Sequence, residues 1–297
     1  EALAEVGGAS AMIINIFVGF FVGISAGATV TISQFFGGKR MKEVREAIHT
    51  AIALAIAGGI IIMVIGMILA PSVLTLMKTP EETMEGSVLY LRIYFCGMIG
   101  NLIYNIGSGI LRAMGDSKKP LYFLIASCLV NVVLDIVLVA AAKMGVAGVA
   151  LATILSQAFS AVLVCGTLVK FPEEYRLRLK SIRFHGWVFK RIIAIGLPAG
   201  CQSLMYSLSN ALIQANVNSF GTDTVAAWTA YGKIDSLFWM VVNAFGIAVT
   251  TFVGQNYGAG LYQRVRKGVR QCLLITAIFT LFLNILIIPL GQILFRL

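Results

Sequence analysis

The sequence is poor in charge, in proline and in histidine. Only 12% of its 297 residues are charged, and it contains 6 prolines and 2 histidines. Hydrophobic residues make up 59% of the chain. Soluble domains carry about 25% charged and about 45–50% apolar residues, so this composition is not that of an ordinary globular protein.

Motifs for covalent and cofactor chemistry are missing as well. The five cysteines each stand alone in an apolar stretch, without a CxxC or a Cys/His pairing, which argues against a disulfide or a thiolate metal site. No GxxxxGK[ST] phosphate loop occurs, and no set of residues typical of a hydrolytic enzyme is visible. We therefore expect neither an enzyme nor a bound cofactor.

The apolar residues fall into long blocks separated by short polar segments. A bilayer core needs about 20 apolar residues per helix, whereas a membrane strand needs only about 10 residues of alternating polarity. The blocks are long and do not alternate, so we predict an all-α polytopic membrane protein. Eight blocks are recognised, at residues 10–35, 48–70, 86–111, 121–142, 145–169, 191–219, 224–253 and 268–295.

Lysine and arginine gather in alternate loops. A net charge of +10 would suggest nucleic-acid binding in a soluble protein, but most of the 23 basic residues follow the first, third, fifth and seventh blocks. Under the positive-inside rule these loops are cytoplasmic. We therefore expect a multi-pass protein of the cell (inner or plasma) membrane with residues 1 and 297 on its outer side, and no nucleic-acid partner.

A weak internal repeat relates the two ends of the chain. At the offset that aligns Gln34 with Gln255, six positions within residues 17–45 are identical to their counterparts, and a basic stretch follows each copy. Both copies end a block that runs from outside to inside, so the repeat is parallel, with an axis along the membrane normal as in many transporters. The identical pairs are Phe17/Phe238, Thr29/Thr250, Gln34/Gln255, Gly37/Gly258, Val44/Val265 and Arg45/Arg266.

The repeat predicts two lobes. We assign residues 1–170 to an N-terminal lobe, 171–190 to a cytoplasmic connector, and 191–297 to the first half of a C-terminal lobe. The second copy has an entry helix before its long block, whereas the first copy opens directly at Glu1. We therefore expect six-helix lobes in the full protein, with about eight of twelve helices present in a chain truncated at both ends. The alternative is a complete protein of eight spans.

Four short segments carry a family pattern. They are residues 33–38 (SQFFGG), 111–120 (LRAMGDSKKP), 196–200 (GLPAG) and 253–260 (VGQNYGAG). Together, and in this order and spacing, they resemble the multidrug and toxic compound extrusion (MATE) family, most closely its DinF-like prokaryotic branch, over essentially the whole chain. The resemblance implies a cation-coupled exporter of twelve helices in two lobes. The wider superfamily includes lipid-linked oligosaccharide flippases, so a flippase is the alternative function.

Asp135 is the leading functional candidate, because it lies inside the fourth block. A carboxylate there costs about 2.5–3.5 kcal/mol on insertion scales and marks a functional site by default. Asn131 lies one helical turn earlier on the same face. An amide and a carboxylate can hold a hard cation through oxygen, or the carboxylate can bind a proton. A structural hydrogen bond to a neighbouring helix explains the residue types equally well.

The resemblance favours the functional interpretation. Family members with a characterised cation site place an Asn and an Asp four residues apart, and a Thr eighteen residues after the Asp. Here these positions are Asn131, Asp135 and Thr153, which the resemblance implies to be a site for proton or Na⁺ coupling. The structural alternative for Thr153 is a hydrogen bond to its own helix. The family's remaining ligand, an Asp on the first helix, is not in this chain.

Further polar residues are candidates for a substrate cavity. Ser207, Asn210 and Gln214 recur on one face of the sixth block, and they line a cavity or bond to a neighbouring helix. Lys233 and Asp235 lie well inside the seventh block but, being two apart, do not face each other. His49 and His185 lie in or near basic loops and have no evident partner in the sequence.

Small residues in the first block are interpreted as packing residues and not as site residues. Gly19, Gly23 and Gly27 form two overlapping GxxxG steps, which favour close helix packing.

These observations together predict an antiporter. Inward movement of H⁺ or Na⁺ would drive export of drug-like, cationic organic compounds by alternating access. The expected partners are the lipid bilayer and small organic substrates, with no obligate protein partner evident. Because one implied carboxylate is absent, we do not expect these 297 residues to transport unaided.

Overall fold

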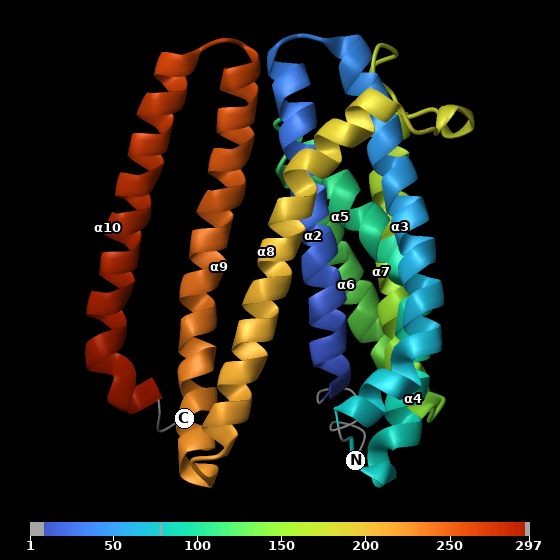
Figure 1. Ribbon diagram of the computed structural model, residues 1–297, viewed down its shortest axis with the longest axis vertical. Helices are drawn as coiled ribbons and strands as arrows, with labels where there is room; N and C mark the ends of the chain where they lie inside the picture. The colour runs from blue at the N-terminus through green and yellow to red at the C-terminus, as the bar shows by residue number, and fades with distance from the viewer. Residues whose placement is uncertain (1–8, 78, 295–297) are drawn as a thin grey trace. The chain divides into compact units, whose positions relative to one another are not determined.

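The computed structural model describes residues 9–77 and 79–294, and this part of the chain is helical, with no strand (Figure 1). Both chain ends, residues 1 and 297, lie outside the described residues. The helices are α2 (Ala9–Gly37), α3 (Met41–Leu76), α4 (Glu81–Cys96), α5 (Met98–Ala113), α6 (Lys118–Asp135), the π-helix η1 (Ile136–Ala141), α7 (Gly145–Val169), the 3₁₀ turn η2 (Leu179–Ser181), α8 (Gly186–Asn218), α9 (Thr222–Gly258) and α10 (Tyr262–Leu294).

Within the described residues, seven helices are long and apolar enough to cross a membrane, or eight if α4 and α5 count as one span. This confirms the all-α polytopic fold. The block at 86–111 was expected to be a single helix, but it bends by 48° between α4 and α5. Gly97 occupies the bend, where the side chain of Ile154 leaves no room for a Cβ. Sharp kinks have local causes of this kind.

Tertiary contacts divide the chain into two compact units. Unit 1 comprises the chain up to Ile32 and Arg40–Ser207, whereas unit 2 comprises Ser33–Lys39 and the chain from Leu208 onward. These units are defined by packing, and the predicted boundaries of the two lobes at 170 and 191 remain a prediction.

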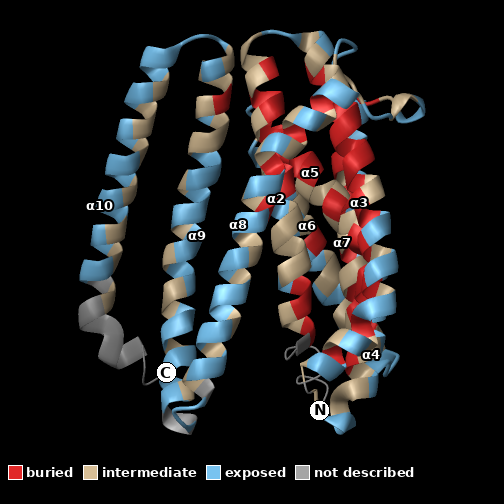
Figure 2. Ribbon diagram, in the orientation of Figure 1, coloured by how far each residue is buried: buried red, intermediate tan, exposed pale blue. Residues whose placement is uncertain are grey.

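The core of unit 1 is built on α3, α5 and α7. Helix α5 packs against both α3 and α7, and α7 also contacts α4 and α6. Figure 2 shows the buried residues concentrated on these facing surfaces. Phe95 of α4 is 1% exposed and meets Phe17 of α2 edge to face, with 5.6 Å between the ring centroids. The outward faces are apolar and exposed, as expected for helices that contact lipid.

Small residues set the crossing of α2 and α8 inside unit 1. A Cβ on Gly23 would overlap the backbone of Gly200, and one on Gly27 would overlap the backbone at Gly196. Both helices therefore bring a GxxxG step to the crossing, which lets their backbones meet. The predicted packing role of the first block's glycines is confirmed at these two positions, and the crossing explains why the first part of α8 groups with unit 1.

A second glycine crossing lies in unit 2, and it joins the two copies of the internal repeat. A Cβ on Gly37 would overlap the backbone of Gln255, and a Cβ on Gly258 would overlap the backbone of Gln34. The contacts are reciprocal, as they are wherever a two-fold axis relates two equivalent segments. The similarity of these segments in sequence thus corresponds to a direct, symmetric contact.

The turn between α5 and α6 is closed by local polar contacts. Gly115 adopts φ 91°, a left-handed conformation that favours glycine. Asp116 accepts the backbone N–H of Lys119 at 3.1 Å and pairs with its ammonium at 2.9 Å. Partial burial raises the pKa of the Asp116 carboxyl, but the bonds and charge of Lys119 outweigh burial and leave that pKa below its usual value. This motif serves the fold.

Candidate functional site

Asp135 is the last residue of α6, at the point where the helix changes from α to π geometry. In the π segment the backbone N–H of Ala142 bonds to the carbonyl of Val137, five residues earlier, at 2.9 Å. A π segment widens the helix and shifts the faces of the residues that follow it. Such segments are frequent at functional sites, and no sequence pattern predicted this one.

Polar side chains form a stripe along one face of α6. Ser127, Asn131 and Asp135 are spaced four residues apart, whereas Leu129 and Val133 on the other side are exposed. Nδ2 of Asn131 and Oδ1 of Asp135 are buried, and neither has a hydrogen-bond partner within the described part of the chain. A buried polar atom without a partner is costly, so the stripe holds unused capacity to bind a proton or an ion.

Helix α7 brings Thr153 to the level of Asn131. Oγ of Ser127 donates to the carbonyl of Ser156 at 2.6 Å, which fixes the register of the two helices. They run antiparallel, and Asn131 and Thr153 lie four and three residues from this bond in the same direction. With a rise of about 1.5 Å per residue the two residues are at nearly equal depth. Asp135 lies one helical turn further along.

The hydroxyl of Thr153 makes a hydrogen bond to its own helix, which was the structural role considered for it from the sequence. Its Oγ1 donates to the carbonyl of Val149 at 2.9 Å. A hydroxyl that donates one hydrogen bond keeps two lone pairs as acceptors. The bond to the helix therefore orients Thr153 without removing its ability to act as an oxygen ligand.

Three further residues at this place were not predicted as site residues. Nε2 of Gln157 donates to Oη of Tyr94 at 3.4 Å, and Oε1 of Gln157 is buried without a partner in the described residues. The Tyr90 and Tyr94 rings are 6.0 Å apart, and the Tyr90 phenol lies within electrostatic range of the Asp135 carboxylate. Gln157 was recognisable in the sequence, since it lies one turn after Thr153.

We call Asn131, Asp135, Thr153, Gln157 and Tyr94 the interior cluster. Its free atoms include carboxylate and amide oxygens, and an amide presents either oxygen or nitrogen after a half-turn. Oxygen atoms suit a proton or a hard cation. No group of three or more His, Cys, Asp or Glu residues arranged to hold a metal ion occurs in the part of the chain that the structure describes.

The cavity candidates lie on α8 and α9. Ser207 lies next to α2, where a Cβ on Gly19 would come within 4.0 Å of its Oγ. Asn210 is exposed and Gln214 half-buried. Lys233 is exposed, and Asp235 accepts a hydrogen bond from the Tyr231 hydroxyl one turn earlier, at 3.4 Å. Their role in a cavity stays a prediction.

Comparison with known families identifies a match. A model of the family described as MatE matches residues 1–137 and 198–297. Among curated proteins, the chain is 29% identical over 262 residues to the probable multidrug resistance protein YoeA of Bacillus subtilis (strain 168), and 32% identical over 258 residues to the probable multidrug resistance protein YpnP of the same organism. Each alignment covers 86% of this chain and 57% of the relative, so the chain spans little more than half their length.

A solved structure shares the fold. It is described as the outward-facing conformation of a multidrug resistance MATE family transporter of the MOP superfamily. The TM-score is 0.88 at 22% sequence identity, with 96% of this chain and 63% of that chain covered.

Proposed function

The chain belongs to the MatE family, and from this premise we propose that it forms part of a cation-coupled antiporter that exports drug-like, cationic organic compounds by alternating access. Both curated relatives are named for multidrug resistance, which favours drug export over the flippase alternative. The observation that carries the coupling proposal is the buried carboxylate oxygen of Asp135 in the interior cluster, which has no hydrogen-bond partner among the described residues.

The interior cluster supports binding of either coupling ion. A proton on Asp135 would turn an unpartnered acceptor into a donor for a neighbouring amide. Na⁺ would instead be held by oxygens of Asp135, Asn131 and Thr153, which lie within about one helical turn of each other in depth. Either ion removes the cost of a buried carboxylate that lacks a partner.

Coupling requires that the ion prefer one arrangement of the helices. A ligand shifts a conformational equilibrium only by its differential affinity for the two states. Asp135 adjoins the π segment η1 and faces α7, so binding there would change the local packing of α6 against α7. We propose that this packing change biases the protein between inward and outward openings, with the basic loops on the cytoplasmic side.

The test is gradient-driven transport by the protein expressed from its full reading frame and reconstituted in liposomes. Asp135→Asn keeps the size of the side chain but cannot carry the charge, so we expect export of a cationic dye driven by a pH or Na⁺ gradient to fall to background. Glu174→Gln, the same chemical change at an exposed connector residue, is the control and should transport normally. Full gradient-driven export by Asp135→Asn would refute the coupling role.

A second pair of variants identifies the coupling ion. If Na⁺ is the ion, Asn131→Ala and Thr153→Ala each remove a ligand, and half-maximal transport should require about tenfold more Na⁺. If the proton is the ion, transport does not depend on Na⁺, and the two variants shift the pH profile instead. Unchanged Na⁺ and pH dependence in both variants would remove Asn131 and Thr153 from the site.

A further inference from the structure

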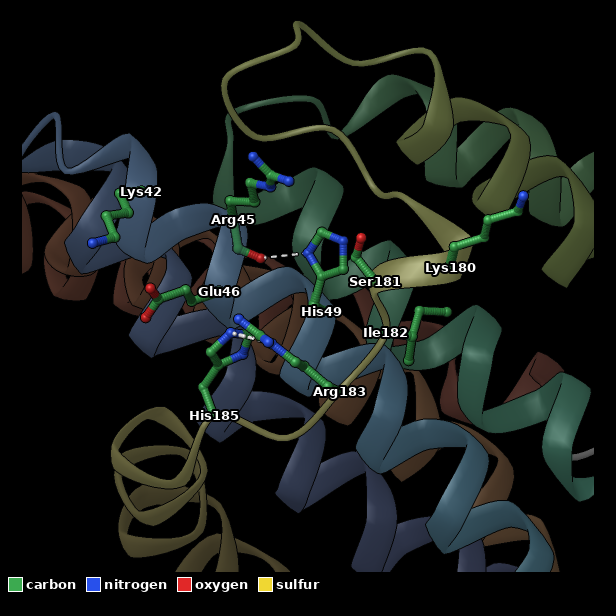
Figure 3. A pocket seen from close by; sticks show the side chains of 9 residues that line it. All are labelled: Lys42, Arg45, Glu46, His49, Lys180, Ser181, Ile182, Arg183 and His185. Atoms are coloured by element: carbon green, nitrogen blue, oxygen red, sulfur yellow. Dashed lines mark hydrogen bonds between the residues drawn. The ribbon is translucent and has the colours of Figure 1, made fainter.

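A basic pocket lies in unit 1, away from the interior cluster (Figure 3). Its volume is about 500 Å³. One wall is a single face of α3, and the other is the connector between α7 and α8. The lining residues are Lys42, Arg45, Glu46, His49, Lys180, Ser181, Ile182, Arg183 and His185.

The cations of this pocket are not neutralised, unlike their neighbours. Nearby, Arg40 pairs with Glu43, and both Arg176 and Arg178 pair with Glu173, at 2.9–3.0 Å. Within the described residues, no ion pair is formed by the four cations that line the pocket, which are Lys42, Arg45, Lys180 and Arg183. The pocket therefore carries more positive than negative charge, with four cations and one carboxylate among its lining residues.

One carboxylate also lines the pocket, and it already has a partner. Oε2 of Glu46 accepts the indole N–H of Trp187 at 3.0 Å. Its negative charge opposes an anionic ligand, but four cations outnumber it.

Hydrogen bonds hold the two walls together. The buried His49 donates from Nδ1 to the carbonyl of Arg45 at 2.7 Å and accepts the backbone N–H of Arg178 at Nε2, at 3.1 Å. The hydroxyl of Thr50 accepts the backbone N–H of His185 at 3.1 Å and contacts its ring nitrogen at 3.2 Å. Both histidines, which lacked evident partners in the sequence, fix the connector to α3, so the pocket is a built feature of the fold.

Arg183 is oriented for binding. Its Nε donates to Nε2 of His185 at 3.2 Å, which leaves its two terminal nitrogens available. A guanidinium offers a fork of donors that matches the oxygens of a phosphate. In Figure 3, Lys42 and Lys180 stand at opposite sides of the pocket, with Arg183 between them.

Exposed apolar side chains adjoin the lining residues along the chain. Leu179 is 64% exposed, Phe184 50% and Trp187 46%. Exposed tryptophan and phenylalanine beside cations are typical of the level of lipid headgroups. A soluble anion would gain nothing from these side chains, whereas the glycerol and upper acyl carbons of a lipid would gain apolar contacts from them.

We propose that this pocket binds a phosphate-bearing anion, and that its occupant is the headgroup of an anionic membrane phospholipid. Phosphate oxygens would contact Arg45 and Arg183, with Lys42 and Lys180 adding long-range attraction. Basic pockets at the ends of membrane helices bind anionic headgroups by this chemistry. Because both α3 and the connector contribute lining residues, a bound headgroup would hold the connector against α3.

The test measures lipid binding directly. The full protein is purified in a neutral detergent, and native mass spectrometry counts bound phosphatidylglycerol against phosphatidylcholine at equal concentrations. The variant Arg45→Gln with Arg183→Gln should bind phosphatidylglycerol about tenfold more weakly or worse. Lys118→Gln with Arg264→Gln removes the same charge from exposed positions in the first turns of α6 and α10 and should bind within about twofold of the unmodified protein.

A second double variant keeps the proposal testable if the first one does not fold. Lys42→Gln with Lys180→Gln changes only exposed side chains, and it should also weaken binding if Arg45→Gln with Arg183→Gln does not fold. A third arm adds inorganic phosphate. Suppose that millimolar phosphate displaces the lipid, and that phosphate stabilises the unmodified protein thermally but not the pocket variants. The pocket would then be an anion site, but its occupant would be a soluble phosphate and not a lipid. Equal lipid binding by the pocket and control variants, or no preference for phosphatidylglycerol, would overturn the proposal.

Discussion

Helices α7 and α10 have similar mean hydropathies but differ in how much of each is buried within the described residues. Their most apolar windows have mean hydropathies of 1.9 and 1.6, yet 39% of the α7 window is buried and none of the α10 window is. Helix α7 contacts α4, α5 and α6, whereas in unit 2 α10 packs on α9. Mean hydropathy therefore does not distinguish a helix that other described helices surround from one that they leave exposed, because lipid tails are as apolar as leucine.

The polar residues follow the same division. In unit 1, atoms of Asn131 and Asp135 are buried, and the neighbouring residues come from other helices. In unit 2, Lys233 is exposed and Asp235 bonds to Tyr231 of its own helix. Within the described residues, buried polar atoms without a partner lie on α6, which packs against α7, and we base the coupling proposal on this pair of helices.

The largest expected effect on stability comes from substituting glycines that are tightly packed in unit 1 and openly exposed in unit 2. Gly23→Ala places a methyl group into the backbone of Gly200, so we expect the free energy of unfolding to fall by about 1–3 kcal/mol. Gly232 of α9 has open space around it, and Gly232→Ala should raise the unfolding free energy by up to about 1 kcal/mol through helix propensity. Unfolding in mixed micelles measures both changes. If the two variants change the unfolding free energy in the same direction, the predicted difference between the two glycines is wrong.

Much of this fold follows from hydropathy alone. The eight predicted blocks correspond to the observed spans, because each needs only enough apolar length to cross a bilayer. The break at Gly97 was missed, since the apolar residues continue through it, and Ile154, which packs against Gly97, is far away in the chain. The π segment after Asp135 was also missed, because its residues are apolar like those of the helix before it.

The site was harder to predict than the fold. Asn131, Asp135 and Thr153 were recognisable through spacing within a helix and family resemblance, and their role remains a prediction. Tyr94 and Gln157 were missed as a pair because 63 residues separate them. His49 finds its partner 129 residues away, at Arg178. Partners brought together by tertiary packing leave no periodic signal, so only the structure reveals them.

A smaller effect tests the reciprocal crossing in unit 2. Gly37→Ala and Gly258→Ala each disturb the contact between the ends of α2 and α9, and we expect each to cost about 1–2 kcal/mol, since helix ends adjust more readily than helix centres. Both changes act on one contact, so the double variant should cost at least about 0.5 kcal/mol less than the sum. Strict additivity in unfolding experiments would mean that the two sites are independent.

The smallest effect concerns the hydrogen bond that sets the register of α6 and α7. Ser127→Ala removes the donor to the Ser156 carbonyl, and bonds between membrane helices contribute about 0.6 kcal/mol on average. Thr250→Ala in α9 removes a hydroxyl that bonds to the carbonyl of Gly246 in its own helix, so it should change stability by less than about 0.3 kcal/mol. Thermal unfolding of the two variants side by side measures the difference. If Thr250→Ala costs as much as Ser127→Ala, the bond between α6 and α7 does not hold their register, and the matched depth of Asn131 and Thr153 must be maintained by apolar packing instead.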